Sequence, residues 1–214
     1  MTLNSDLNLL KNGLMRKYVR NEVVVVYKTK EAFGGLSNMA SGYPLNINDI
    51  CVLTTEALYQ ACRFPHMPKI QQEIIGQYNP MISKKISKPY QAFSRPDWNS
   101  VRFKVMRWCL RVKLAQNYEE FGGLLLATGN RPIVEQSRKD DYWGAKLVDD
   151  VGNVLVGQNV LGRLLMELRE KIKKDTENML YTVRPLNIPD FSLLDQPIGI
   201  IKSHKLENRQ KNLF

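Results

Sequence analysis

The most constraining feature of the sequence is residues 54–64, which predict a short helix with one carboxylate among apolar and aromatic side chains. At 100° per residue such a helix has two faces. The apolar face comprises Ala57, Leu58, Ala61, Cys62 and Phe64, and the polar face comprises Glu56, Tyr59, Gln60 and Arg63. Thr54 or Thr55 is suited to cap the helix, which places Glu56 in its first turn.

Glu56 has two interpretations at this point. Free N–H groups and the helix dipole favour the charged form of a carboxylate in a first turn. A carboxylate held ionised suits a general base or a group that stabilises developing positive charge. Glutamate is also common in first turns simply because it helps helices to begin, so this segment alone leaves both interpretations open.

Length and composition indicate one globular protein with a basic surface. The 214 residues are enough for one sizeable core, and 43% hydrophobic with 24% charged residues is an ordinary globular balance. The net charge of +10 makes polyanions plausible partners. Nucleic acid, a phosphorylated small molecule and a merely soluble basic surface all fit that charge.

Cysteine and histidine usage argues against a disulfide scaffold and a metal centre. The three cysteines are an odd number without the close pairing of a zinc site, and Cys62 and Cys109 lie on apolar helical faces as expected of buried thiols. His66, between two prolines, is expected in a loop. Residues 1–14 lack the apolar core of a signal sequence and no run is long enough to span a membrane, so we expect a cytoplasmic protein without membrane association.

Hydrophobic periodicity predicts a mainly α fold with a few short strands. Helices are expected over residues 69–77, 81–88, 98–117, 118–127 and 159–172, and strands over residues 22–27 and 133–135. Residues 148–155 predict a hairpin with Gly152-Asn153 at its tip, and residues 43–53 are expected to be irregular. Asp97 and Asn159 are suited to cap the two longest helices.

Three parts are predicted along the chain. A basic extension covers residues 1–20, with at best one short amphipathic helix, and a single domain covers residues 21–175. Residues 176–214 form a basic extension interrupted by prolines, which predicts a wrapped or partly mobile tail. On the helix over residues 98–117, Lys104, Arg107 and Arg111 form a basic ridge.

Two further segments have the composition of a ligand site. Gly34-Gly35 precedes Ser37 and Asn38, and glycines allow backbone N–H groups to approach a ligand, although a plain turn is the more frequent meaning. Residues 140–144 (DDYWG) combine two acids, two aromatics and a glycine. Such a segment can form one side of a pocket in which aromatics stack on a base, or it can anchor the core.

Taken together, these stretches resemble the NADAR family of small N-glycosidases. The matching pieces, in chain order, are residues 35–39, 55–61, 79–85 and 95–98, Met106 with Lys113, and residues 125–129, 134–135, 140–144 and 159–169. No single piece is diagnostic, but nine pieces in order over residues 24–172 are a specific signal. The chain departs from the family pattern at Ala57, often histidine, at Met39, often phenylalanine, and after Gly144, where Ala145 replaces a glycine.

The resemblance implies a mainly helical single NADAR-like domain that cleaves a bond between ribose C1 and a nitrogen. Some members resemble riboflavin-intermediate N-glycosidases, which hydrolyse phosphoribosylamino pyrimidines. Others are antitoxins that remove ADP-ribose from guanine bases in DNA after a partner ADP-ribosyltransferase toxin has attached it. The basic ridge and the net charge favour the second activity here, with ADP-ribosylated DNA as substrate and a cognate toxin as a possible partner.

The resemblance also suggests which residues perform the chemistry. The expected catalytic residues are Glu56, Lys84 and Asp140, and the expected substrate-binding residues are Ser37, Asn38, Tyr59, Arg95, Trp143, Gly144 and Asn159. Glu56 is the carboxylate near C1, and Lys84 is either a nucleophile, provided that burial lowers its pKa, or a phosphate ligand. The chemistry needs no metal and no cofactor. A non-catalytic module that binds ADP-ribose or nucleic acid is the alternative.

Overall fold

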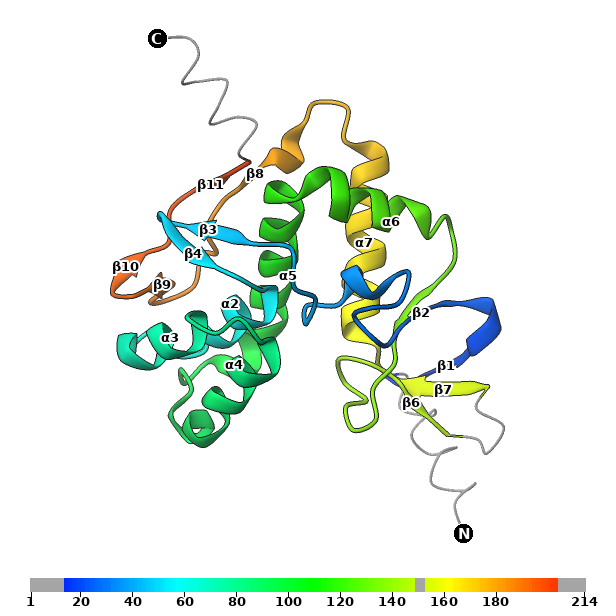
Figure 1. Cartoon of the computed structure of the whole chain (residues 1–214), viewed down its shortest axis with the longest axis horizontal. Helices are drawn as coiled ribbons and strands as arrows, with labels where there is room; N and C mark the ends of the chain where they lie inside the picture. The colour runs from blue at the N-terminus through cyan, green and yellow to red at the C-terminus, as the bar shows by residue number, and fades with distance from the viewer. Residues whose placement is uncertain (1–13, 149–152, 204–214) are drawn as a thin grey trace. The chain divides into compact units, whose positions relative to one another are not determined.

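The computed structural model describes residues 14–148 and 153–203, and Figure 1 shows its elements. The chain divides into two compact units, each made of two segments. Unit 1 comprises Met1–Ser37 and Leu124–Lys171, and unit 2 comprises Asn38–Gly123 and Ile172–Phe214. Six α-helices and only short strands are present in the described residues, so the mainly α prediction is confirmed. No described helix is long and apolar enough to cross a membrane.

Unit 1 contains most of the short strands that pair over long sequence separations. Strand β7 (Val154–Gly157) lies between β1 (Arg16–Val19) and β6 (Lys146–Leu147) in an antiparallel sheet. Strand β2 (Val24–Val26) pairs in parallel with β5 (Ile133–Glu135). Strand β1 falls within the predicted extension over residues 1–20, whose expected helix lies outside the described residues. The predicted hairpin is present as β6 and β7, although Gly152 at its predicted tip is also outside them.

The core of unit 1 follows from its apolar alternation. Val23, Val134, Ala145 and Leu155 form a buried cluster against which Tyr18 and Val25 pack. Helix α7 (Val160–Lys174) buries the predicted stripe, of which Leu161, Leu164, Leu165 and Leu168 lie in unit 1 and Ile172 lies in unit 2. Helix α6 (Gly123–Ala127), at the start of the second segment, is short. Two 3-10 turns, η1 (Arg20–Glu22) and η2 (Gly34–Leu36), complete the first segment of this unit.

Unit 2 is built around the long helix α5 (Trp98–Gln116), which matches its predicted bounds. Its apolar residues bury against α2 (Thr55–Ala61), and α3 (Pro68–Ile75) and α4 (Pro80–Ser87) pack on α2 in turn. Prolines stand at the first positions of α3 and α4, where a missing N–H costs nothing. A 3-10 segment, η3 (Lys88–Phe93), follows α4, and a π-helical turn, η4 (Tyr118–Gly122), follows α5.

Residues 43–53 are not irregular as expected but contain a β-hairpin. Strand β3 (Leu45–Ile47) pairs with β4 (Ile50–Val52) through Asn48 and Asp49, which have φ of 51° and 65°. Asparagine and aspartate tolerate this left-handed backbone, and two such residues in succession make the tight turn that matches strand twist. The run is short and partly polar, so its alternation was too weak to predict strands.

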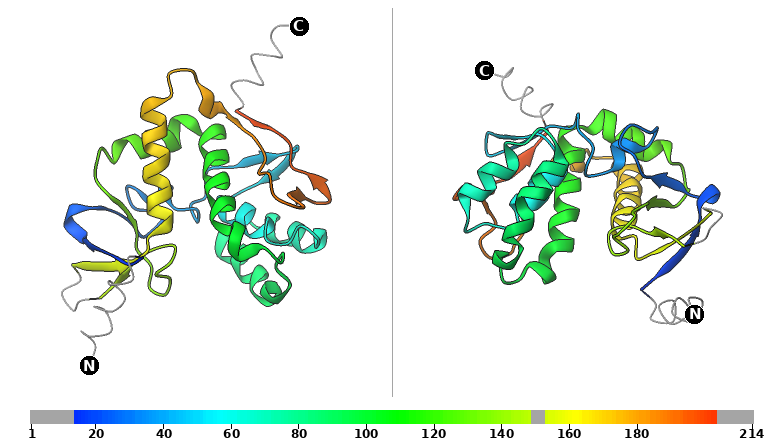
Figure 2. Two further views of the ribbon diagram at one scale, coloured as in Figure 1. Left: turned by 180° about the vertical axis from the view of Figure 1, so that it is seen from behind. Right: turned by 60° about the horizontal axis from the view of Figure 1, so that its bottom comes forward.

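The C-terminal segment wraps along α5, as Figures 1 and 2 show in orange to red. It forms η5 (Met179–Tyr181), β8 (Thr182–Val183), β9 (Ser192–Leu193), β10 (Gln196–Pro197) and β11 (Ile201–Lys202). Strand β11 pairs with β8, and both contact α5. Trp108 Nε1 donates to the Arg184 carbonyl at 3.0 Å, which fixes the segment to the helix. The described part of this segment therefore packs against α5.

Candidate functional site

Helix α2 is buried on every side and begins at a side-chain cap. Thr54 is the N-cap, and its hydroxyl oxygen accepts a hydrogen bond from the Ala57 backbone N–H at 3.2 Å. The backbone N–H of Glu56 donates to the Asn38 carbonyl oxygen at 3.0 Å. All seven helical residues are buried, so the polar face predicted for this helix is not solvated. Ala57, which departs from the family pattern, is fully buried among apolar groups.

The Glu56 carboxylate is only 3% exposed and is held at both oxygens. The Asn38 side-chain amide donates to Oε2, and the Gln60 side-chain amide donates to Oε1 at 2.8 Å. Burial penalises a carboxylate charge, whereas hydrogen bonds to the charged form stabilise it. Two amide donors and the first-turn position together favour an ionised, oriented carboxylate. Glu56 and Asn38 were both predicted to be functional, and the structure brings them together.

Gln60 is the partner of Glu56 that sequence analysis did not identify. It lies one helical turn after Glu56 and is 5% exposed. The spacing of four residues was the available signal, because side chains at i and i+4 meet on one face of a helix. Its own Oε1 is buried without a described hydrogen-bond partner. The Glu56 cluster, which we define as Glu56, Asn38 and Gln60, is therefore polar inside an apolar unit.

Aromatic side chains pack next to the Glu56 cluster. The Tyr59 and Trp98 rings are 5.1 Å apart between centroids, and the Arg63 guanidinium lies 5.3 Å from the Trp98 centroid. Burial, and then the nearby charge of Glu56, raise the pKa of Tyr59 above its ordinary value. The phenol therefore stays protonated at neutral pH. A phenol, an indole and a guanidinium are the kinds of group that contact sugars and bases, although Tyr59 and Trp98 are themselves buried here.

The raised pKa of Tyr59 predicts how stability changes in alkali. The unfolded phenol ionises near pH 10, whereas the folded one does not, so the stability linked to Tyr59 is full below about pH 10 and is lost as pH rises further. We expect Tyr59→Phe to lose less unfolding free energy than the wild type between pH 9 and 11. Urea unfolding across this range measures the effect. Identical slopes for both proteins would contradict it.

Arg95 was predicted to bind phosphate, and its guanidinium is instead engaged within unit 2. It is 4% exposed, donates to both Asp97 carboxylate oxygens and donates to the Pro189 carbonyl. The Arg95 hydrogen bond lowers the pKa of Asp97. Asp97 is the N-cap of α5 as predicted, but its side chain makes no cap hydrogen bond because the guanidinium occupies the carboxylate. Nη1 of Arg95 is buried without a described hydrogen-bond partner.

The predicted lysine pair lies on the surface of α4. Lys84 and Lys85 are both exposed. The nucleophilic role of Lys84 required burial, and the structure does not provide it. A phosphate-binding role needs only an exposed ammonium group and stays a prediction.

Three other predicted residues lie in unit 1, in the loop before β6. Asp140 Oδ1 accepts hydrogen bonds from the backbone N–H groups of Tyr142 at 3.0 Å and Trp143 at 2.9 Å, which orders the loop. The Tyr142 and Trp143 rings meet edge to face at 5.0 Å and both are half-buried. A Cβ on Gly144 would collide with the Glu135 carbonyl oxygen, so this position requires glycine for a close backbone approach. The substrate roles of these three residues stay predictions.

Asn159 and Ser37 are buried in unit 1. The Asn159 side chain donates to the Ile133 carbonyl at 2.8 Å and accepts from the Glu135 N–H at 3.0 Å, and its own backbone N–H donates to the Gly144 carbonyl. It therefore joins the start of α7 to β5, and the substrate role of Asn159 stays a prediction. Ser37 is 4% exposed, and its N–H donates to the Gly34 carbonyl at 3.1 Å.

The remaining predicted groups have structural roles in unit 2. Cys62 and Cys109 are buried free thiols as expected, and burial raises the pKa of Cys109. Lys113 is fully buried with its ammonium 4.1 Å from the Tyr43 ring centroid and 4.3 Å from that of Phe121. His66 lies in the exposed loop after α2. Within the described residues, no group of three or more His, Cys, Asp or Glu side chains could hold a metal.

Comparison with known proteins places most of the chain in one family. The NADAR domain family model matches residues 25–173. N-glycosidase YbiA of Shigella boydii is 35% identical over 154 residues, which are 72% of this chain and 91% of that protein. Riboflavin biosynthesis protein VVA0006 of Vibrio vulnificus is 31% identical over 162 residues, which are 75% of this chain but only 41% of that protein. The NMR structure of Escherichia coli YbiA matches 74% of this chain and 89% of its own, with a TM-score of 0.60 and 32% identity.

The mainly helical fold is thus shared with the solved structure of a named N-glycosidase. The chain belongs to the NADAR family. This membership supports a hydrolase that cleaves N-glycosidic bonds.

Proposed function

We propose that the protein removes ADP-ribose from guanine bases in DNA, as the antitoxin to an ADP-ribosyltransferase toxin. The observation that carries the catalytic part is the Glu56 cluster, in which a buried carboxylate is oriented by amide donors at both oxygens. A fixed negative charge in a dry site acts more strongly on a developing positive charge than the same group in water.

The proposed reaction is hydrolysis at ribose C1. The bond between C1 and the guanine nitrogen breaks, and its electron pair goes to the nitrogen. Water adds its hydroxyl group to C1 and its remaining proton is transferred to the departing guanine. Glu56 stabilises the positive charge that builds on the sugar, and it is suited to accept the proton of the attacking water and pass it on to the departing guanine. Lys84 is exposed, and this route does not use an imine at its side chain.

Other residues are assigned from the family resemblance. Asp140 is proposed to hold ribose hydroxyls or to orient water, and Trp143 to stack on the base. Tyr59 remains a protonated phenol beside Glu56 and is suited to donate a hydrogen bond to substrate. Lys84 is proposed as a ligand of the pyrophosphate. These assignments require no metal and no cofactor.

Charge favours the DNA substrate over a free metabolite. The chain carries 31 Lys and Arg against 21 Asp and Glu, and the ridge on α5 concentrates cations on one helix face. Phosphate contacts supply much of the affinity of proteins for DNA. The competing candidate is a phosphoribosylamino pyrimidine, which the name of the Vibrio vulnificus relative favours. That relative contains much sequence beyond the matched region, so its name describes a larger protein.

A direct comparison of the two substrates tests the proposal. The protein is incubated separately with an oligonucleotide that carries ADP-ribosylated guanine and with the phosphoribosylamino pyrimidine. Chromatography then quantifies free ADP-ribose and ribose 5-phosphate. We expect ADP-ribose release at a kcat/KM at least tenfold higher than that for the pyrimidine. Release of ribose 5-phosphate alone would overturn the proposed substrate and leave the N-glycosidase class intact.

A further inference from the structure

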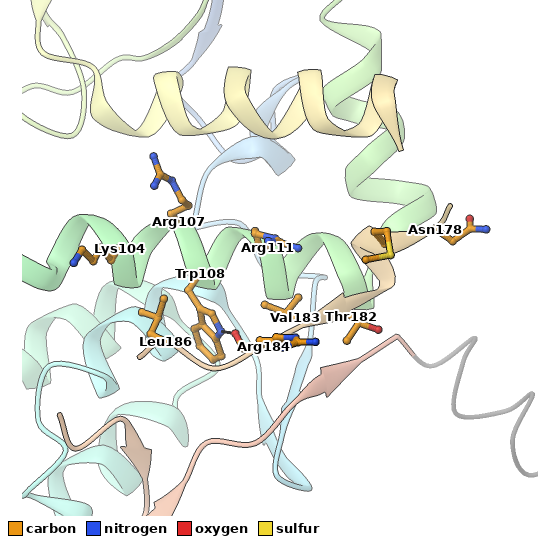
Figure 3. A pocket seen from close by; sticks show the side chains of 10 residues that line it. Lys104, Arg107, Trp108, Arg111, Asn178, Thr182, Val183, Arg184 and Leu186 are labelled. Carbon is orange, nitrogen blue, oxygen red and sulfur yellow. Dashed lines mark hydrogen bonds between the residues drawn. The ribbon is translucent and has the colours of Figure 1, made fainter. Parts of the chain in front are cut away.

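The basic ridge on α5 forms one side of a groove in unit 2. The groove has a volume of about 830 Å³ and lies between α5 and the segment that contains η5 and β8. Figure 3 shows Lys104, Arg107 and Arg111 following one another along α5, with Arg184 on the opposite segment. We call this feature the α5 groove. None of its ten described lining residues is acidic.

Three cations of the α5 groove, Lys104, Arg111 and Arg184, are available to an external anion. Lys104 and Arg184 are exposed and Arg111 is half-buried. In the part of the chain that the structure describes, these three side chains have no carboxylate partner. Like charges placed together without counter-charges raise the local potential and attract polyanions. This pattern differs from Arg95, whose charge is already matched by Asp97.

The groove keeps its shape because both sides are joined at the base. Trp108 is 3% exposed, donates from Nε1 to the Arg184 carbonyl and packs edge to face on Phe191 at 4.9 Å. The helix and the C-terminal segment are therefore held together directly beneath the cations. A preformed groove binds with less ordering of side chains and backbone than one that must assemble around its ligand.

We propose that the α5 groove binds the phosphodiester backbone of a single-stranded DNA segment next to the modified base. This inference rests on the proposed function, which requires a DNA substrate. Lys104 and Arg111 are seven residues apart, or roughly 10 Å along the helix, so the two cations can contact different phosphates of one strand. A groove of this volume holds a nucleotide-scale piece of one strand and not a duplex. Enzymes that act on bases commonly need the base outside a duplex.

Two matched double variants test the proposal in the full chain. Lys104→Ala with Arg184→Ala removes two exposed cations from the groove. Lys69→Ala with Lys88→Ala removes two exposed lysines from α3 and η3, elsewhere in unit 2. The probe is an unmodified fluorescein-labelled 12-nucleotide single strand, followed by fluorescence anisotropy between 50 and 200 mM salt. The matching RNA and free ADP-ribose serve as competitors.

We expect the groove variant to bind DNA roughly three- to tenfold more weakly, with the slope of log affinity against log salt reduced by about 1.4. The control variant should retain wild-type affinity and slope. Equal weakening in both variants, no weakening in either, preferential binding of the RNA, or displacement of the DNA by free ADP-ribose would each overturn the proposal. Groove-dependent DNA binding without hydrolysis of the modified oligonucleotide would instead refute the proposed function, so the two failures are distinguishable.

Discussion

Glu56→Gln is expected to lower kcat on ADP-ribosylated DNA by about 10²–10³-fold. The substitution keeps the size of the side chain and removes its charge. The new side-chain amide also brings an N–H donor to a position where Asn38 and Gln60 already donate, so two donors face each other. An unfavourable contact of this kind in a buried site costs about 1–3 kcal/mol. Steady-state kinetics, circular dichroism and ADP-ribose binding separate lost chemistry from lost structure.

Glu73→Gln is the matched control for Glu56→Gln. Glu73→Gln is the same chemical change on α3 of the same unit, but the Glu73 side chain is exposed. Its kcat should remain that of the wild type. If Glu56→Gln retained full turnover, the protein would not use this carboxylate, and a non-catalytic binding module would account for its biological effect. If Glu56→Gln lost both turnover and fold, Asn38→Ala would give a milder disruption of the same cluster.

Gly162→Ala is expected to have the largest effect on stability. Gly162 lies in the first turn of α7, where an added Cβ would stand far inside van der Waals contact of the Ile133 carbonyl oxygen and the Asn159 amide. The same amide joins α7 to β5. Backbone atoms cannot move aside as a flexible side chain can, so we expect a loss of about 3 kcal/mol. Thermal unfolding should show a Tm lower by about 6–12 °C.

Gly123→Ala provides the comparison for this effect. Gly123 is also helical, but a Cβ there meets no atom within 4 Å. Alanine loses less conformational entropy than glycine on folding, so this variant should match or exceed the wild type by up to about 1 kcal/mol. Similar destabilisation by both variants would indicate a general intolerance of substitution and not the close packing of α7 on β5.

Hydrophobic periodicity and helix-boundary residues made much of the fold predictable. The apolar stripes of α5 and α7 repeat over several helical turns, so the sequence pattern was long enough to predict both helices. Prolines marked the starts of α3 and α4. The parallel pairing of β2 with β5 could not be predicted, because it joins residues more than a hundred positions apart. The β3–β4 hairpin was missed because three-residue strands give too few positions to reveal alternation.

Only part of the candidate site could be predicted from the sequence. The motif residues identified Glu56 and Asn38, but a helical wheel assigns a polar face to solvent by default, and here that face is buried with its partners. Hydrogen bonding also engages polar and charged residues within the protein: Arg95 is bound by Asp97, and Asn159 by the backbone of β5. Sequence gives the type and spacing of such side chains, whereas tertiary packing decides which of them remain available to a ligand.

The most direct test of the central claim is the mass of the oligonucleotide after a single turnover. An oligonucleotide with one ADP-ribosylated guanine is mixed with excess enzyme and followed by mass spectrometry. We predict that it returns to its unmodified mass as one equivalent of free ADP-ribose appears, and that Glu56→Gln slows this step by about 10²–10³-fold. An unchanged oligonucleotide mass, or a product that keeps ribose on guanine, would contradict cleavage of the C1–nitrogen bond at the Glu56 cluster.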